Sequence, residues 1–194
     1  MGQYYKAVLL DRDGAMMVAS PTKFDNGFKL MEHSWIGNNF VNAVLECLDG
    51  TPRFLAWIGD YAIEVINDSD KIGTAPRELA KKCYEYAWER EADDGVLASN
   101  AEKFDLSLEN RDCFIVNNTT KEYVDMERYI EENKDDVGWC INPLPLLTAV
   151  GNGLGGGDYC GINEDATGIW AFNEIYVTRI CPSNYDERVL RFKE

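Results

Sequence analysis

The sequence predicts an α+β protein in which antiparallel β hairpins form a sheet flanked by two to three helices. Two observations predict this class: short strand-like segments are joined by turn residues, and two segments carry apolar residues at helical spacing. The chain has 194 residues, and a chain of that length buries about 70% of the surface that its unfolded form exposes. We therefore expect residues 1–194 to form a single compact domain.

The first third of the chain is expected to hold a hairpin and then a helix. YYKAVLL at 4–10 is typical of a strand, and DRDG at 11–14 is a turn that leads into AMMVAS. Asn38 or Asn39 can cap the helix, which should end near Gly50. One face of this helix would carry the apolar residues Phe40, Val41, Val44, Leu45 and Leu48.

The remaining elements are expected from the same signals. RFLAWIGDYAIEVI at 53–66 predicts a strand that turns at, or passes through, Gly59. The clearest helix is expected over 75–91, with Thr74 as its N-cap and Pro76 in its first turn, where a missing N–H has little effect. The rest of the chain would form the strands CFIVNN and KEYVDM, a short acidic helix near 127–133, and a last strand, GIWAFNEIYVTRI.

The sequence contains one internal similarity. AVLLDRDGAMMV at 7–18 aligns without gaps on CFIVNNTTKEYV at 113–124, and each segment is followed much later by a strand that contains tryptophan. Two similarly built halves, about 1–70 and 110–182, would produce this similarity, and so would two unrelated hairpins.

The charge of the chain restricts its partners. Thirty-four acidic residues against 19 Lys and Arg give a net charge of −15 and a pI near 4.4. Such a field repels nucleic-acid phosphates and anionic lipids, so we expect neither direct nucleic-acid binding nor membrane association. The acidic surface would suit a basic protein partner, and it would also serve solubility alone. The oligomeric state is left open.

The cysteine and histidine pattern predicts neither a metal site nor a cofactor. The cysteines lie far apart, without a C-x-x-C pair, and His33 is the only histidine. Zinc sites need clustered thiolate or imidazole ligands. Apolar neighbours favour buried thiols in a reducing compartment. The sequence starts without a basic-then-apolar leader and has no apolar run of about 18 residues, so a soluble, cytoplasmic protein is expected.

A glycine-rich segment, AVGNGLGGGDYCG at 149–161, places Gly151, Gly153 and Gly156 in G-x-G-x-x-G spacing. In a dinucleotide-binding fold these glycines open a helix whose N-terminus holds a pyrophosphate. Here the following residues have no helical period, and Asp158 would repel phosphate. Two interpretations remain: a connection that needs glycine for its backbone, or a loop that contacts a ligand.

Few residues suggest catalysis. The weak catalytic candidates are His33, Asp60 and Asp158. Asp60, Asp158 and Glu174 would form a carboxylate group only if the glycine loop and the two tryptophan-containing strands met. Because acidic residues are so abundant, such a grouping also arises by chance.

The aromatic residues and the glycine loop supply the candidate binding surface. Five Trp and ten Tyr are many for this length, and they would either pack in the core or form a partly exposed surface that anchors a ligand or a protein. The predicted binding residues are Trp57, Tyr61, Asn152, Gly155, Gly156, Asp158, Tyr159 and Trp170.

Four segments, MGQYYKAV, GFKLMEHSWIGNNFVNAVL, WIGDY and PLPLLTAVGNGLGGGDYCG, resemble a family of small proteins from Gram-positive gut-type bacteria and their bacteriophages. The family brings no established activity and no catalytic residues. A basic residue is common in its loop where this chain has Leu154, which makes anion binding less expected here. The resemblance implies a phage or mobile-element accessory protein.

We therefore expect a non-enzymatic protein that binds a host protein or sequesters a small ligand, in a counter-defence role for example. The alternative is a small hydrolase or nucleotide-processing enzyme that uses carboxylates near the glycine loop.

Overall fold

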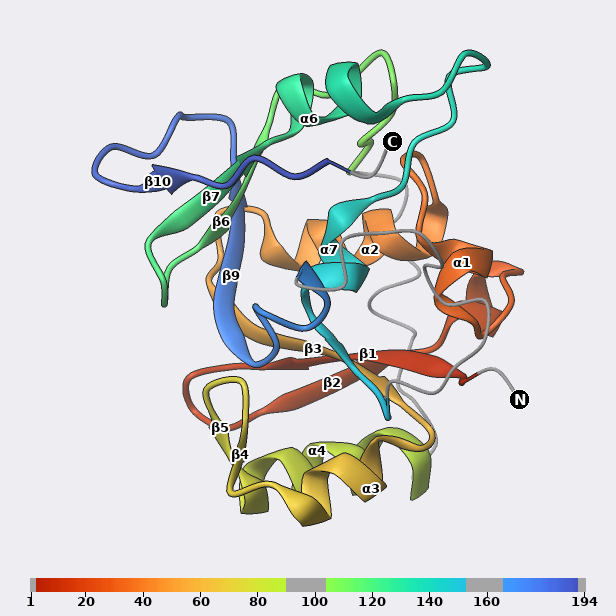
Figure 1. Ribbon diagram of the computed structural model, residues 1–194, viewed down its shortest axis with the longest axis vertical. Helices are drawn as coiled ribbons and strands as arrows, with labels where there is room; N and C mark the ends of the chain where they lie inside the picture. The colour runs from red at the N-terminus through yellow and green to blue at the C-terminus, as the bar shows by residue number, and fades with distance from the viewer. Residues whose placement is uncertain (1–2, 90–103, 153–165, 192–194) are drawn as a thin grey trace.

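The computed structural model describes residues 3–89, 104–152 and 166–191 (Figure 1). The predicted fold class is confirmed, because a large sheet dominated by antiparallel pairs is combined with helices. The described residues contain six α-helices, however, and not two or three. The additional helices are short, between four and seven residues, too short for a clear helical period in the sequence.

The main sheet has the strand order β10-β7-β6-β9-β3-β1-β2, and a small sheet pairs β4 with β5. Strand β3 is central: β1 lies along one edge, while β9 pairs with the first half of the other edge and β8 with the second half. The strands are β1 (Tyr5–Leu10), β2 (Met16–Ala19), β3 (Arg53–Gly59), β4 (Lys71–Ile72), β5 (Ala75–Pro76), β6 (Phe114–Asn117), β7 (Glu122–Asp125), β8 (Ala149–Val150), β9 (Asn173–Thr178) and β10 (Asp186–Glu187).

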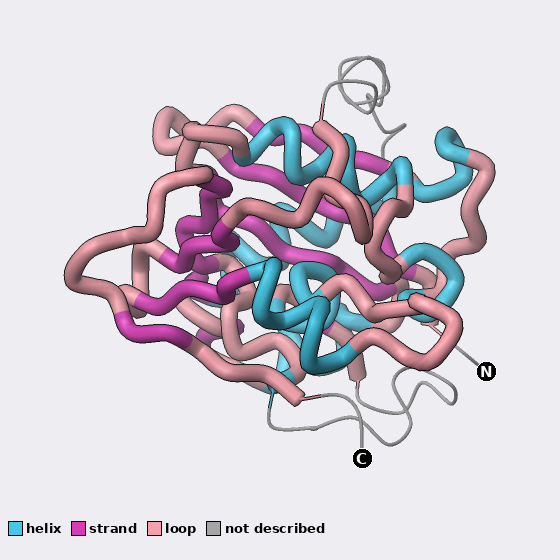
Figure 2. Tube along the Cα trace, turned by 90° about the horizontal axis from the view of Figure 1, so that it is seen from above, coloured by secondary structure: helices cyan, strands magenta, loops and turns pink. Residues whose placement is uncertain are grey.

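The helices cover the sheet unevenly. Figure 1 shows α3 and α4 on one side of β1 to β3, α2 and α7 on the other side, and α6 beside the β6–β7 hairpin. Viewed from above, in Figure 2, several strands cross the middle of the molecule with helices beside them, and other strand segments lie at its lower left edge. The helical segments are η1 (Pro21–Phe24, a 3-10 helix), α1 (Leu30–His33), α2 (Asn39–Leu48), α3 (Ala62–Asp68), α4 (Arg77–Glu89), α6 (Met126–Asn133) and α7 (Pro143–Leu147).

The helix predicted after Asn38 is confirmed. The Asn38 side chain accepts hydrogen bonds from the backbone N–H groups of Phe40 and Val41, which satisfies two donors that have no partner inside the helix. The predicted apolar stripe is buried. The short acidic helix also forms, as α6, with Asp125 as its N-cap.

Two predicted boundaries are wrong. In the 53–66 segment the chain does turn after Gly59, where β3 ends, but the residues that follow form α3 from Ala62 and not a strand. The 75–91 helix begins at Arg77: Pro76 belongs to β5, and the Thr74 hydroxyl donates to the Phe172 carbonyl (2.6 Å) and caps no helix. The Thr74 side chain, which the local sequence predicts as a helix cap, is instead engaged in a tertiary hydrogen bond.

The two segments that resemble each other form hairpins with the same surroundings. In each case helices follow, and a later strand then pairs antiparallel with the first strand of the hairpin: β3 with β1, and β9 with β6. The strands β3 and β9 pair with each other at the middle of the sheet. Such an order is expected of two similarly built halves, and the duplication itself stays a prediction.

The gapless alignment of the two hairpins is wrong after their turns. Five residues, 11–15, connect β1 to β2, whereas four residues, 118–121, connect β6 to β7. One extra residue reverses the face to which the following side chains point. Val18 therefore packs on the α3 and α4 side of the sheet, and its aligned counterpart Val124 packs on the α2 side.

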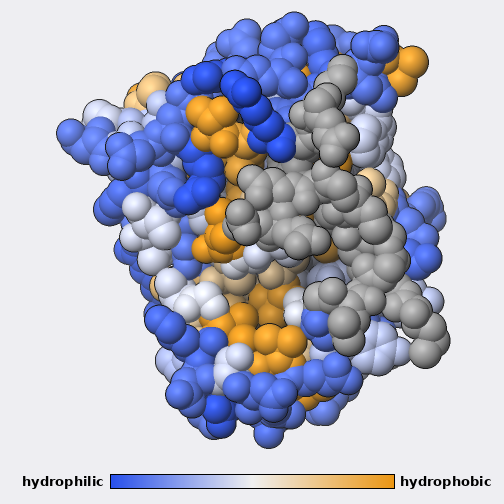
Figure 3. All heavy atoms as spheres, in the orientation of Figure 1, coloured by the Kyte–Doolittle hydropathy of each residue, from blue (hydrophilic) through white to orange (hydrophobic). Residues whose placement is uncertain are grey.

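Two apolar clusters lie on opposite faces of β1 and β3. The larger contains Leu9, Leu55 and Trp57 and extends over α2 and α7 to the β6–β7–β9 strands. The smaller contains Val8 and Ile58 and lies under α3 and α4. Figure 3 shows a mostly hydrophilic face with apolar side chains in a band across its middle.

The cysteines behave largely as the sequence suggests. Cys47, Cys83, Cys113 and Cys140 are buried and not joined in disulfides, and Cys181 is exposed and not in a disulfide either. Burial raises the pKa of Cys83 to about 11, which keeps this thiol protonated and unreactive at neutral pH.

Candidate functional site

Three strand ends meet at the start of the glycine-rich segment. Tyr5 opens β1 directly opposite Gly59, the last residue of β3, and Val150 ends β8 beside β3. This arrangement brings together residues that are far apart in the sequence, and we call this group the strand-end cluster. Its members are Gln3, Tyr5, Gly59, Gly151 and Asn152.

At the two glycines of this cluster, neighbouring side chains fill the space that a Cβ atom would take. A Cβ atom on Gly59 would overlap the Gln3 side-chain oxygen and lie 3.2 Å from the Val150 carbonyl oxygen. A Cβ atom on Gly151 would overlap the Gln3 oxygen and the Tyr5 hydroxyl. For Gly151, the first residue of the G-x-G-x-x-G spacing, close packing is the reason for glycine.

A chain of polar side chains crosses the cluster. Gln3 donates through Nε2 to Oδ1 of Asn152, and Asn152 donates through Nδ2 to Oε2 of Glu64 (3.4 Å) on α3. Gln3 is only 1% exposed, and its Oε1 atom has no hydrogen-bond partner within the described part of the chain. A buried acceptor without a donor destabilises the fold by about 1–3 kcal/mol, a penalty that an added donor would remove.

The edge of the cluster is acidic. Asp60 follows β3; its carboxylate accepts from the Tyr4 N–H (3.0 Å), and its carbonyl accepts from the Tyr84 hydroxyl (2.8 Å). Burial, and then the Asp60 carboxylate, raises the pKa of Tyr84, so that this hydroxyl stays protonated and donates. Glu64 is exposed and Asp60 is half-buried. The two carboxylates favour neutral or cationic molecules over phosphates.

His33 belongs to the core. It is fully buried, its Nδ1 lies 3.0 Å from the Gly27 carbonyl, and its Nε2 accepts from Nε1 of Trp57 (3.1 Å). These partners require the neutral ring, with its proton on Nδ1. Burial lowers its pKa to about 4. With both nitrogens engaged away from solvent, this imidazole has no position from which to act on a substrate.

The two predicted binding tryptophans are also core residues. Trp57 and Trp170 are both fully buried, so neither can belong to an exposed aromatic surface. Trp170 donates through Nε1 to Oε2 of Glu122 (3.0 Å). Although burial opposes it, hydrogen bonds from Arg188, Thr120 and Trp170 lower the pKa of Glu122.

The suggested carboxylate group does not assemble from its described members. Glu174 is opposite Phe54 in the β3–β9 pair. Asp60 comes six residues after Phe54, just beyond the end of β3, or about 20 Å away at the usual strand rise. Glu174 is engaged elsewhere, in an ion pair with Arg12 (2.5 Å) and a hydrogen bond from Asn118.

The other predicted binding residues divide into two sets. Asn152 and Tyr61 are half-buried at the strand-end cluster and at the start of α3, respectively. The remaining predictions lie outside the described residues: Gly155, Gly156, Asp158 and Tyr159.

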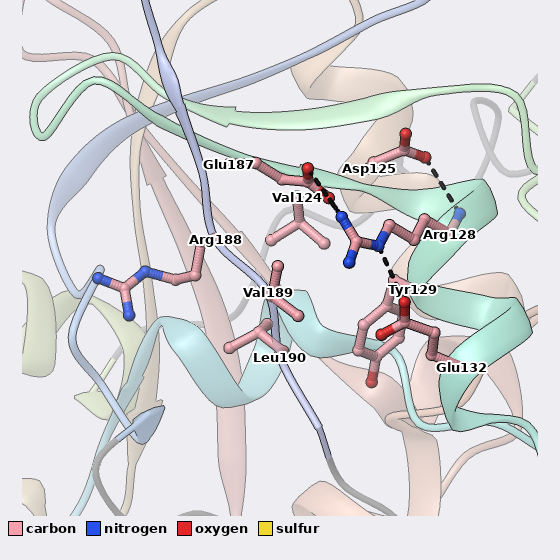
Figure 4. A pocket seen from close by; sticks show the side chains of 9 residues that line it. All are labelled: Val124, Asp125, Arg128, Tyr129, Glu132, Glu187, Arg188, Val189 and Leu190. Carbon is pink, nitrogen blue, oxygen red and sulfur yellow. Dashed lines mark hydrogen bonds and ion pairs between the residues drawn. The ribbon is translucent and has the colours of Figure 1, made fainter.

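A hollow between α6 and the C-terminal segment is a weaker candidate. Figure 4 shows the Arg128 guanidinium between Glu187 and Glu132, with ion-pair distances of 3.1 and 2.9 Å. The hollow has an empty volume of about 190 Å³ including its open mouth, below the roughly 300–1,000 Å³ of ligand pockets. Its charges are paired with one another, which leaves little for a ligand to bind.

Comparisons of the chain with protein-family models, with curated proteins and with solved structures found no match. Within the described ranges, no group of three or more His, Cys, Asp or Glu residues could hold a metal ion. No helix of the described residues has the length and apolar character to cross a membrane.

The sequence does not predict Gln3, a member of the cluster, or Glu64, which accepts from Asn152 at its border. Gln3 lies 149 positions from its partner Asn152, and no local pattern relates the two. Its place in MGQYY, one of the segments that carry the family resemblance, was the only available signal.

Proposed function

We propose that this chain is a non-enzymatic binding protein that holds a small polar molecule at the strand-end cluster. The observation that carries the proposal is the buried and unpaired Gln3 oxygen beside the Asn152 amide. An N–H group of a ligand would satisfy this oxygen and remove the penalty for its burial.

The charges around the cluster define the ligand class. Asp60 and Glu64 lie beside Gln3 and Asn152, and the chain carries a net charge of −15. Neutral molecules with N–H donors, or cationic amines and guanidines, fit this environment, whereas phosphorylated molecules are repelled. Nucleosides and polyamines are the simplest representatives.

A binding role is favoured over turnover because the only imidazole is enclosed in the core. The resemblance to phage and bacterial proteins supports a setting in a mobile element, where removal of a small host molecule would serve counter-defence.

A thermal-shift screen tests the proposal. The probes are adenosine, guanosine and cytidine, their 5′-monophosphates, agmatine, arginine and spermidine. At about 100 times its Kd a ligand adds roughly 2.7 kcal/mol, which raises the Tm of a chain of this size by about 5–10 °C. We expect at least one uncharged or cationic probe to do so, with weaker effects from the monophosphates.

Two variants of one helix provide the control. Glu64→Gln should weaken binding of the active probe at least about tenfold, whereas Asp68→Asn, which removes the same charge from the end of α3, should leave it within about twofold. A screen without any shift, or equal binding by both variants, contradicts the proposal. A new product in the probe mixture, detected by chromatography, would instead favour the hydrolase alternative.

A further inference from the structure

A turn after α6 exposes two large apolar side chains. Val137 is 88% exposed and Trp139 is 43% exposed, although both lie in a short connection between α6 and α7. In Figure 1 the chain leaves α6 through a loop that projects beyond the helices. We call residues 135–139 the apolar turn.

The apolar turn is held in one conformation by Asp135. Its Oδ1 atom accepts from the N–H groups of Val137 (3.0 Å) and Trp139 (2.7 Å), its N–H donates to the Trp139 carbonyl (2.8 Å), and its carbonyl accepts from Gly138 (3.1 Å). Gly138 has a φ of +88°, a backbone conformation that favours glycine. Four hydrogen bonds therefore fix a segment whose two apolar side chains contribute little to the core.

Such preorganisation matters for binding. Ordering a mobile loop at an interface opposes association, and a loop that is already ordered avoids that loss. Tryptophan is among the residues that most often dominate interface energy, because it buries a large rigid surface. Exposed aliphatic residues are common singly, but here Val137 and Trp139 are presented together on one rigid turn.

The surroundings of the apolar turn are acidic. Leu108 packs against Gly138, which places the exposed Glu109 in the neighbouring segment. Three cations lie near these segments. Lys134 and Arg111 are both paired with Glu131, and Arg179 donates to the Asn110 side chain and to the Asp112 carbonyl (2.8 Å). The acidic residues in the apolar turn itself are Asp135 and Asp136, and those in the neighbouring segment 105–112 are Asp105, Glu109 and Asp112.

We propose that the apolar turn binds a basic segment of a partner protein in which Lys or Arg flank aromatic or aliphatic residues. Val137 and Trp139 would supply the buried centre of the interface, and the acidic residues around them would meet Lys and Arg at its rim. This site is separate from the strand-end cluster and does not depend on the proposed small ligand. A protein partner, not a nucleic acid, fits a negative rim.

A peptide selection tests the proposal. A random peptide library is selected on the full chain after depletion on the Val137→Ser/Trp139→Ser double variant. We expect enriched peptides in which Lys or Arg flank aromatic or aliphatic residues, with affinity that falls as salt rises through about 0.15 M. Val137→Ser and Trp139→Ser should each weaken such a peptide at least about tenfold.

Ile180→Ser is the matched control, because Ile180 is 79% exposed but lies two residues after the end of β9, away from the apolar turn. It should leave peptide affinity within about twofold, as should Glu64→Gln at the strand-end cluster. All variants change exposed positions, and unchanged melting curves verify their folding. The proposal is overturned by a selection without enrichment, by acidic or neutral peptides, by equal binding to the variants, or by sedimentation that shows Trp139-dependent dimerisation of the chain.

Discussion

His33 is held as a neutral ring between the Gly27 carbonyl and the Trp57 indole, with its side chain sealed from solvent. Protonation would place a charge in the core and replace the Trp57 hydrogen bond with two opposed N–H donors. The folded pKa is accordingly about 4, with burial as the main cause. A single histidine in the sequence makes this behaviour measurable.

The free energy of unfolding should fall as the pH is lowered from about 6.5 to about 4. Across this interval the unfolded chain binds a proton at His33 that the folded chain does not bind. The difference between the two pKa values corresponds to about 3 kcal/mol. Urea unfolding at a series of pH values, read by circular dichroism, measures it.

His33→Gln isolates the contribution. A glutamine can still donate to Gly27 and accept from Trp57, but it does not titrate. Its unfolding free energy should vary less with pH over this interval, and any carboxylate contributions should be common to both proteins. Parallel pH profiles for the two proteins would show that His33 titrates normally.

At the scale of elements, the ends of β1, β3 and β8 lie so close together that a Cβ atom on Gly59 or Gly151 would overlap the Gln3 side chain. The same closeness joins Gln3 to Asn152 and produces the candidate site. The site thus arises from how three strands terminate and not from any one of them.

Gly151→Ala should lower the free energy of unfolding by about 1–3 kcal/mol, because its Cβ atom would overlap Gln3 and Tyr5. Chemical denaturation of the purified variant measures the loss. In a Gln3→Ala background the same change should be less destabilising, since one of the two obstructing side chains is gone. Equal losses in both backgrounds would mean that Gln3 does not restrict this position.

At the scale of the whole molecule, the two apolar clusters share β1 and β3 as their common wall. Val8 and Leu9 are neighbours in the chain but belong to different clusters. Neither cluster can lose its packing without disturbing the strands that support the other. This sharing supports the expectation of one domain, even if the two halves arose by duplication.

We expect one cooperative unfolding transition. Val44→Ala in the larger cluster and Ile66→Ala in the smaller should each lower the free energy of unfolding by roughly 1–4 kcal/mol, because both residues are fully buried. The midpoint of the unfolding transition should fall accordingly. Circular dichroism and tryptophan fluorescence should give the same midpoint for each variant. Two separated transitions, each sensitive to one variant, would divide the chain into two units.

The sequence by itself determined the fold class, both hairpins, α2 with its Asn38 cap, and α6. These features depend on interactions within a few residues: apolar periodicity, turn residues and capping side chains. It also determined the charge that favours basic or neutral partners. The predictions were wrong where a distant segment competes with a local signal. The Thr74 hydroxyl, for example, donates to the Phe172 carbonyl and does not cap a helix.

Only the tertiary structure decided which polar residues meet. The sequence could mark Asn152, but it could not place Gln3 and Glu64 beside it, since strand order and register bring them together. The sequence predicted His33, Trp57 and Trp170 as site residues from their residue types, but the structure shows that all three are buried in the core. Exposure likewise distinguished Trp139 from the other tryptophans. Burial and long-range pairing are properties of the packed chain, and no window of sequence contains them.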